Sequence, residues 1–128
     1  MPSLNRVQLI GYLGRDPETR FTPTGKKVTQ FSVAVSRRWR GAEGESKERT
    51  DWFNVEAWGK LGETCQEYLH KGSLTYIEGR LQTDQYEQEG EKRYFTKVVA
   101  SHMQMLDRKS GEEEVLPPPV EDEEFPFE

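Results

Sequence analysis

The stretch that decides the fold is Thr50–Gly59, which reads TDWFNVEAWG. Its side chains alternate in character, as in a β-strand, where successive residues point to opposite faces of the sheet. One face is apolar and consists of Phe53, Val55 and Ala57. The other face is polar except for Trp52 and Trp58. Because a half-buried strand normally keeps its large rings on the core side, either a second protein layer covers these two rings or they form a platform on which flat ligands stack.

The rest of the chain supplies four more strands and one helix. The expected strands, in chain order, are Asn5–Leu13, Val28–Ser36, Thr50–Gly59, Leu74–Thr83 and Arg93–Leu106. Leu61–His70 instead has apolar residues at the spacing of one helical face, and the residues expected to end this helix are His70, Lys71 and Gly72. We expect polar loops at Arg15–Lys27 (a loop or a ribbon), Arg37–Arg49 and Asp84–Lys92.

Glycines inside two of the expected strands, Gly11 and Gly79, indicate bends or bulges of the kind that barrels require. The order of three strands, one helix and two strands is typical of a Greek-key barrel. The sequence therefore predicts an all-β fold, a five-stranded barrel of the oligonucleotide/oligosaccharide-binding (OB) type, with its helix between strands three and four.

Charge divides the chain of 128 residues into two parts. Residues 1–110 contain all 18 Lys and Arg and 15 of the 23 Asp and Glu, whereas residues 111–128 contain eight carboxylates and no basic residue. This asymmetry indicates a polyanionic partner for the body and a basic partner for the tail. Residues 107–128 also contain three consecutive prolines, so we predict one domain over residues 1–106 and a disordered, flexible acidic tail over residues 107–128.

Groups for catalysis or metal binding are sparse. His70 and His102 have no second ligand type at metal-ligand spacing, and no phosphate-binding loop or nucleophile motif occurs. Cys65 lies on the apolar side of the expected helix, where a free cysteine is usually packed. The sequence therefore predicts no enzyme, no metal and no cofactor. A single cysteine, an N-terminus without signal-peptide features and the lack of a long apolar run indicate a cytosolic protein.

Aromatic residues beside basic ones are the clearest candidates for a ligand site. Trp39 lies within Arg-Arg-Trp-Arg, and Lys60 follows Trp58-Gly59. Exposed rings can stack on nucleobases while neighbouring cations bind the phosphates, and each stack contributes roughly 1–3 kcal/mol whatever the base. The rings that fall in expected loops or on polar strand faces are Trp39, Trp52, Trp58 and Tyr86. The alternative for each of them is a ring packed on the surface.

Several motifs, in this order, resemble the bacterial single-stranded DNA-binding protein family. They are NRVQLIGYLGRDPETRFTPTG, FSVAVSRRWR, ERTDWFNVEAWGKLGETCQEYLHKGS, YIEGRLQT and MQMLDR. The resemblance covers about residues 4–108 and returns at the acidic Phe-Pro-Phe end. It implies an OB-fold protomer, usually assembled as a homotetramer, that wraps single-stranded DNA in replication, recombination and repair and is associated with the nucleoid in the cytoplasm.

The resemblance also implies roles for particular residues. The family's base-stacking aromatics correspond to Trp39, Trp52, Trp58 and Tyr86. Its phosphate-contacting cations correspond to Arg6, Arg20, Arg37, Lys60, Lys71 and Arg93. The tail tip, which recruits genome-maintenance proteins in this family, corresponds to Asp122, Glu123, Glu124, Phe125, Pro126 and Phe127.

The chain departs from the family pattern at three places. Glu128 follows Phe127, whereas the family's tip usually ends at phenylalanine. Only some twenty residues separate the body from the end of the chain, fewer than in many relatives, which shortens the reach of the tip. Asp84 and Gln85 precede Tyr86 where many relatives are basic.

Two alternatives to single-stranded DNA binding follow from the same residues. The barrel can be the scaffold of an interaction module, with its tryptophan side as a subunit or partner interface and the tail as the active element. It can also be an RNA-binding OB domain. Relative binding to oligo(dT), oligo(U) and duplex DNA separates these possibilities.

Overall fold

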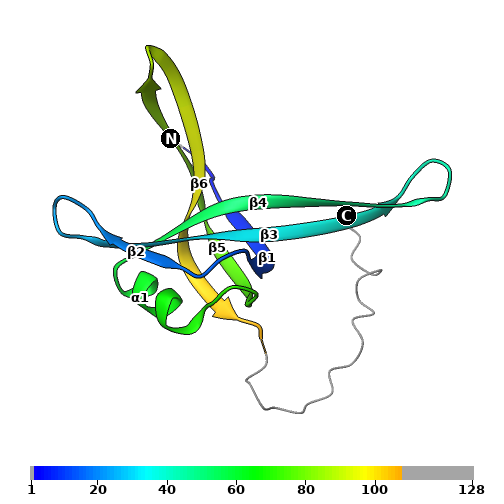
Figure 1. Cartoon of the computed structure of the whole chain (residues 1–128), viewed down its shortest axis with the longest axis horizontal. Coiled ribbons are helices and arrows are strands. Elements are labelled where there is room, and N and C mark those ends of the chain that lie inside the picture. The colour runs from blue at the N-terminus through cyan, green and yellow to red at the C-terminus, as the bar shows by residue number, and fades with distance from the viewer. Residues whose placement is uncertain (1, 108–128) are drawn as a thin grey trace.

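Six strands and one helix make up residues 2–107, the part of the chain that the computed structural model describes. In chain order they are β1 (Val7–Leu13), β2 (Glu18–Phe21), β3 (Lys27–Arg40), β4 (Ser46–Trp58), α1 (Gly59–Tyr68), β5 (Leu74–Gln88) and β6 (Glu91–Met105) (Figure 1). The predicted acidic tail lies outside these residues except for Asp107, whose Oδ1 accepts a hydrogen bond from the backbone N–H of Leu74 at 2.8 Å. The folded body therefore includes Asp107, one residue more than predicted.

Five of the strands close into a barrel. Neighbouring strands follow the order β1-β5-β6-β4-β3, and β1 returns to pair with β3 at Tyr12–Ala34, which completes the ring. The contact between β4 and β6 is parallel, with Val55 opposite Val98, whereas the other strand pairs are antiparallel. The prediction of a five-stranded OB barrel with one helix is confirmed. The sixth strand, β2, pairs only with β3, in a segment predicted to be a loop or a ribbon.

The core follows the alternation seen in the sequence. Side chains from all five barrel strands meet inside, and its buried members include Leu9, Leu13, Phe31, Val33, Val55, Ala57, Ile77 and Val98. Each such residue contributes roughly 1.5–3 kcal/mol through removal of apolar surface from water. α1 packs against β3 and β4 and adds Cys65 to the same core, and Leu69, directly after the helix, joins it. The predicted packing of Cys65 is confirmed, since its side chain is fully buried.

Barrel closure depends on Gly11. A Cβ at this position would overlap the carbonyl oxygen of Ala34 on β3, so a larger residue would keep the two strands apart. A register shift also lies between Glu78 and Gly79 on β5. The predicted irregularity is thus present at Gly79, whereas Gly11 marks a close approach of two strands.

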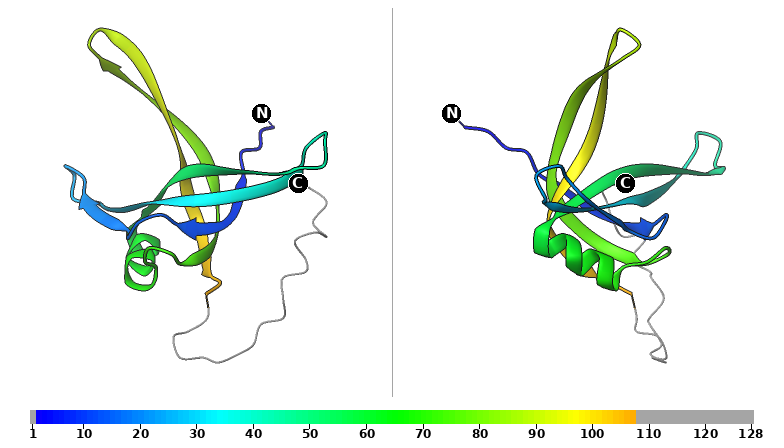
Figure 2. Two further views of the ribbon diagram at one scale, coloured as in Figure 1. Left: turned by 45° about the vertical axis from the view of Figure 1, so that its right-hand side comes forward. Right: turned by 60° about the vertical axis from the view of Figure 1, so that its left-hand side comes forward.

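Two long ribbons extend from the barrel in different directions (Figures 1 and 2). One is the continuation of β3 and β4, which pair as far as Arg40–Ser46, and the other is the continuation of β5 and β6, which pair as far as Gln88–Glu91. The predicted loops at 37–49 and 84–92 are therefore wrong. Polar side chains on both faces resemble a loop in sequence, but cross-strand hydroxyl pairs support these ribbons instead, with 2.9 Å between the oxygens of Ser36 and Thr50 and of Thr83 and Thr96.

The helix is present, but its predicted end is wrong. It begins at Gly59 and finishes at Tyr68, and Leu69 already has an extended backbone. Leu69 leaves the helix to bury its side chain, while the N–H of His70 donates to Oγ of Ser73 at 3.0 Å. Gly72 has a positive φ of 90° in the turn that follows rather than at the helix terminus.

Candidate nucleic-acid interface

The two tryptophans of β4 lie on the outer side of the barrel wall. Phe53, Val55 and Ala57 point the opposite way, toward the core. Trp52 is 60% exposed and Trp58 is 38% exposed, so the described residues cover each ring only in part. Within a single chain, both rings are therefore accessible to a flat ligand.

Arg20 of β2 lies in the same cross-strand row as Trp58. Arg20 pairs with Val28, and Val28 pairs with Trp58, so the three side chains lie on one face of three adjacent strands. Trp52 occupies the other end of this face and pairs with Ala34. The register thus places one cation and two rings on a single surface.

The ring of Trp52 lies against the backbone of Gly14. A Cβ at Gly14 would overlap ring atom Cζ3 of Trp52. The N–H of Gly14 donates to the carbonyl of Ser32 at 3.1 Å, which fixes its backbone beside β3. The glycine therefore permits the observed position of the ring.

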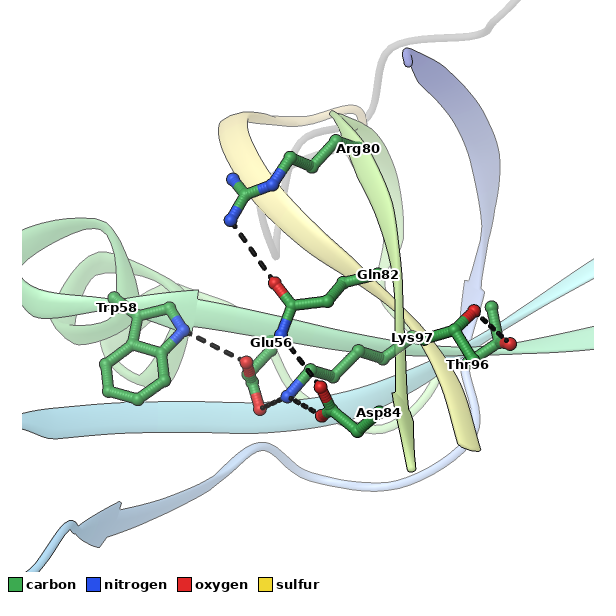
Figure 3. Close-up of polar contacts among 8 residues, drawn as sticks. Glu56, Trp58, Arg80, Gln82, Asp84, Thr96 and Lys97 are labelled. Carbon is green, nitrogen blue, oxygen red and sulfur yellow. Dashed lines mark hydrogen bonds and ion pairs between the residues drawn. The ribbon is translucent and has the colours of Figure 1, made fainter. Parts of the chain in front are cut away.

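Trp58 is held by a chain of polar contacts that runs from β4 to β5 (Figure 3). Its Nε1–H donates to Oε1 of Glu56 at 3.0 Å, and Oε2 of Glu56 lies 3.0 Å from Nζ of Lys97 on β6. Nζ of Lys97 also lies 2.9 Å from Oδ2 of Asp84 on β5. Since Glu56 and Lys97 are 41 residues apart, this cluster ties the barrel part of β4 to the base of the β5–β6 ribbon.

The cluster is electrostatically coupled. Burial alone would lower the pKa of Lys97, but its hydrogen bonds to Asp84 and Glu56 outweigh that effect and raise it. Hydrogen bonds from Lys97 and Gln82 lower the pKa of Asp84. Both shifts favour the charged forms of Lys97 and Asp84.

Tyr86 and Arg93 belong to the same surface. They lie opposite each other in the β5–β6 ribbon, and alternation places them on the side that carries Asp84 and Lys97. Because Lys97 contacts Glu56, this side of the ribbon continues into the outer side of β4. We call the combined surface the tryptophan face; its candidate ligand-binding members are Arg20, Trp52, Trp58, Tyr86 and Arg93.

Trp39 lies on a different face of β3. It pairs with Lys47 and shares its side of the strand with Phe31 and Val33, whose side chains enter the core. Trp39 therefore lies in a strand and not in a loop, and the ribbon face around it is polar, because Arg37, Lys47 and Arg49 share it. Trp39 is exposed because the ribbon has left the barrel there, and the guanidinium of Arg37 lies 4.9 Å from its ring centroid.

The remaining predicted cations lie outside the central part of this face. Arg6 pairs with Glu78 at the outer side of β1 and β5, and hydrogen bonds from Tyr76 and Arg6 lower the pKa of that carboxylate. Lys60 lies in the first turn of α1, next to Trp58. Lys71 follows the helix, and its backbone N–H donates to Asp16 at 2.8 Å.

Two hollows open on the tryptophan face. The larger, of about 530 Å³, lies beside Trp58 and is also lined by Arg80, Gln82 and Lys97. The smaller, of about 240 Å³, is lined by Arg15, Arg20, Asn54 and Phe95, among others. Sequence reasoning missed Arg15, Asn54, Arg80, Phe95 and Lys97. Alternation along the strands was the available signal for the last two, since Arg93, Phe95 and Lys97 share one face of β6.

Metal sites, membrane spans and the tail tip remain to be considered. Among residues 2–107, no group of three His, Cys, Asp or Glu side chains is arranged to hold a metal ion. No helix in this region has the length and apolar character needed to cross a bilayer. The predicted partner-docking residues, Asp122, Glu123, Glu124, Phe125, Pro126 and Phe127, lie outside the described residues.

The family profile and two curated relatives all belong to one family of single-strand binding proteins. The sequence profile described as "Single-strand binding protein family" matches residues 4–106. "Single-stranded DNA-binding protein 1" of Chlorobaculum tepidum is 47% identical over 110 residues, which span 84% of this chain and 68% of that protein. A "Single-stranded DNA-binding protein" of Neisseria meningitidis serogroup A is 48% identical over 105 residues, which span 81% of this chain and 60% of that protein.

A solved structure has the same fold. It is described as "Plasmodium falciparum SSB complex with ssDNA" and superimposes with a TM-score of 0.77 at 29% sequence identity. The match covers 84% of this chain and 98% of the other. The similarity thus extends over nearly all of the residues that form the barrel and its ribbons.

Proposed function

Because the chain belongs to the single-strand binding protein family, we propose that it binds and protects single-stranded DNA without sequence preference. It is a binding protein and not an enzyme. The observation that carries the proposal is the exposure of Trp52 and Trp58 on one face of the barrel, in the same surface as Arg20. Two accessible rings and a cation suit a ligand with flat bases and a charged backbone.

In the proposed mechanism, different residues bind the base and the phosphate of each nucleotide. Bases stack on aromatic rings, which accept any base because every base has a flat face. Phosphates contact lysine and arginine side chains and release counterions, so affinity falls as salt rises. The stacking residues are Trp39, Trp52, Trp58 and Tyr86; the phosphate-contacting residues are Arg6, Arg20, Arg37, Lys60, Lys71 and Arg93.

The cellular role proposed for the protein follows that of the family it resembles. It acts in the cytoplasm in replication, recombination and repair, as a homotetramer associated with the nucleoid. Its acidic tip, Asp122–Phe127, recruits genome-maintenance proteins. The excess of carboxylates after residue 110 supports this part of the proposal because such a segment suits a basic docking site.

A gel-shift series with oligo(dT), oligo(U) and duplex DNA of equal length tests the function. We expect binding to oligo(dT) well above the other two, with an affinity that decreases as salt is added. Absence of any shift would favour the interaction-module alternative, and preference for oligo(U) would favour an RNA-binding domain. Sedimentation with and without oligo(dT) tests the subunit number.

A further inference from the structure

The smaller hollow on the tryptophan face has a composition that suits a single nucleotide. It lies over β3 and β4, beside the core residues Phe31 and Val55. The ring of Phe95, which is 43% exposed, forms part of the wall. A volume of about 240 Å³ lies just below the range of roughly 300–1,000 Å³ typical of small-molecule pockets, which favours one flat ring system over a larger ligand. We call this hollow the Phe95 pocket.

Cations and amides complete the lining. Arg15 and Arg20 contribute guanidinium groups, and Gln30 and Asn54 contribute side-chain amides. Arg15 contacts Glu18 only at 3.5 Å. Within residues 2–107, the hydrogen bonds and ion pairs do not involve the side chains of Arg20, Gln30 or Asn54. These groups are therefore available to a ligand.

We propose that the Phe95 pocket is a nucleotide subsite, in which Phe95 stacks on one base and Arg15 and Arg20 bind the adjacent phosphate. This proposal rests on the proposed function, because it assigns a further contact to the same DNA strand. The amides of Gln30 and Asn54 each offer both a donor and an acceptor, so they can bond the edge of any base. The subsite is consequently tolerant of sequence.

The charges of the pocket determine which way the nucleotide faces. Glu56 of β4 and Lys97 of β6 line the side of the pocket away from β2, and Asp84 contacts Lys97 from β5. On that side the ammonium of Lys97 is already paired with two carboxylates, whereas Arg15 and Arg20 lie on the β2 side, so a phosphate is attracted more strongly to the β2 side. The base therefore points inward, toward Phe95, and the phosphate remains outside on the side of Arg15 and Arg20.

The neighbouring residue, Tyr94, provides a matched control. Tyr94 is 65% exposed and hence more accessible than Phe95, but it pairs with Gln85 on the other side of the β5–β6 ribbon. Phe95 pairs with Asp84 on the side of the tryptophan face. Exposure alone would select Tyr94 as the stacking residue, whereas the strand register selects Phe95.

The test measures binding of the full chain to fluorescein-labelled oligo(dT) by anisotropy. We expect Phe95→Ala to weaken binding about fivefold or more, the lower end of the range for one lost stack. Tyr94→Ala should stay within about twofold of the original protein, as surface substitutions usually do. Phe95→Tyr retains a flat ring and should restore binding. Urea unfolding midpoints of all variants identify any that are simply destabilised.

Salt dependence separates a lost stack from a lost phosphate contact. Phe95→Ala should leave the slope of log affinity against log salt unchanged, whereas Arg20→Gln should reduce that slope by about one. Equal binding by Phe95→Ala and Tyr94→Ala would overturn the subsite, and so would a reduced salt slope in Phe95→Ala. If the unaltered protein fails to bind oligo(dT), the proposed function itself fails, which is a different result.

Discussion

Nζ of Lys97 lies 3.0 Å from Oε2 of Glu56, and this contact joins β6 to β4 across the floor of the tryptophan face. Both side chains are largely buried, with 14% of Lys97 and 8% of Glu56 exposed. Since the second oxygen of Glu56 accepts the indole N–H of Trp58, the ion pair also positions one of the proposed stacking rings. The position of Trp58 therefore depends on the Lys97–Glu56 ion pair, although neither residue is among the proposed phosphate-contacting residues.

We predict that Lys97→Met lowers the free energy of unfolding by about 3 kcal/mol, because it leaves the buried carboxylate of Glu56 without its partner. Because the side chain of Asp84 is 47% exposed, water reaches the cluster. We therefore expect a loss of unfolding free energy at the lower end of the range for broken buried pairs. Urea denaturation measures the change. Lys92→Met, at an exposed position of the same strand, should change stability by only about 0.5 kcal/mol. An equal effect of both substitutions would contradict a structural role for the Lys97–Glu56 pair.

The strands near the core were predictable from sequence because one face of each is apolar. Alternation identified Trp52 and Trp58 as outward-facing residues, and the structure agrees. Trp39 was instead expected in a loop, because β3 continues beyond the barrel, where no apolar face marks the strand.

Contacts between distant strands were not predictable. Alternation says which residues of one strand share a face, but it does not give the register between strands. The pairing of β4 with β6 places Glu56 beside Val99, and this register brings Lys97 to Glu56 across 41 positions of sequence. Alternation places Phe95 on the same face of β6 as Arg93 and Lys97, and the register then shows that this face continues into that of Trp58.

Trp52→Ala is predicted to cost more in DNA affinity than in stability. The ring is mostly exposed, so its loss removes little buried surface, whereas one lost base stack weakens binding by about 1–3 kcal/mol. Titration with oligo(dT), followed by tryptophan fluorescence in the original protein and by anisotropy in the variant, measures the binding. Urea unfolding gives the stability. Tryptophan fluorescence that is indifferent to single-stranded DNA would contradict the stacking role.

Gly14→Ala should weaken DNA binding through Trp52 without changing any charge. The added methyl group overlaps the position of the Trp52 ring and forces the ring to move. We expect lower affinity for oligo(dT) with an unchanged salt slope, because the phosphate contacts remain. In a Trp52→Ala background the same substitution should have little further effect on binding, since coupled sites are not additive. Additive losses in the double variant would argue against this contact as the cause.

Removal of residues 108–128 is predicted to leave DNA affinity unchanged or to increase it, most clearly at low salt. The segment contains eight carboxylates and only two basic residues, so its loss reduces repulsion of a polyanion. The truncation keeps Asp107, because Oδ1 of this residue accepts the N–H of Leu74. A full-length chain whose tail acids are replaced by Gln and Asn is the control for charge. Weaker binding by the truncated protein would refute the prediction.

Stability should fall as pH rises above about 9, in part because of Cys65. Burial raises the pKa of this thiol from 9.0 to about 11, so between these values the unfolded chain loses a proton that the folded chain keeps. The thiol makes no pH-dependent contribution below this window. From pH 8 to about pH 10.5, we expect the original protein to lose about 2 kcal/mol more unfolding free energy than Cys65→Ala, at roughly 1.4 kcal/mol per pKa unit. Titration of Lys97 affects both proteins alike, so urea denaturation of the pair isolates the thiol, and equal losses would mean that Cys65 ionises as readily in the folded chain as in the unfolded one.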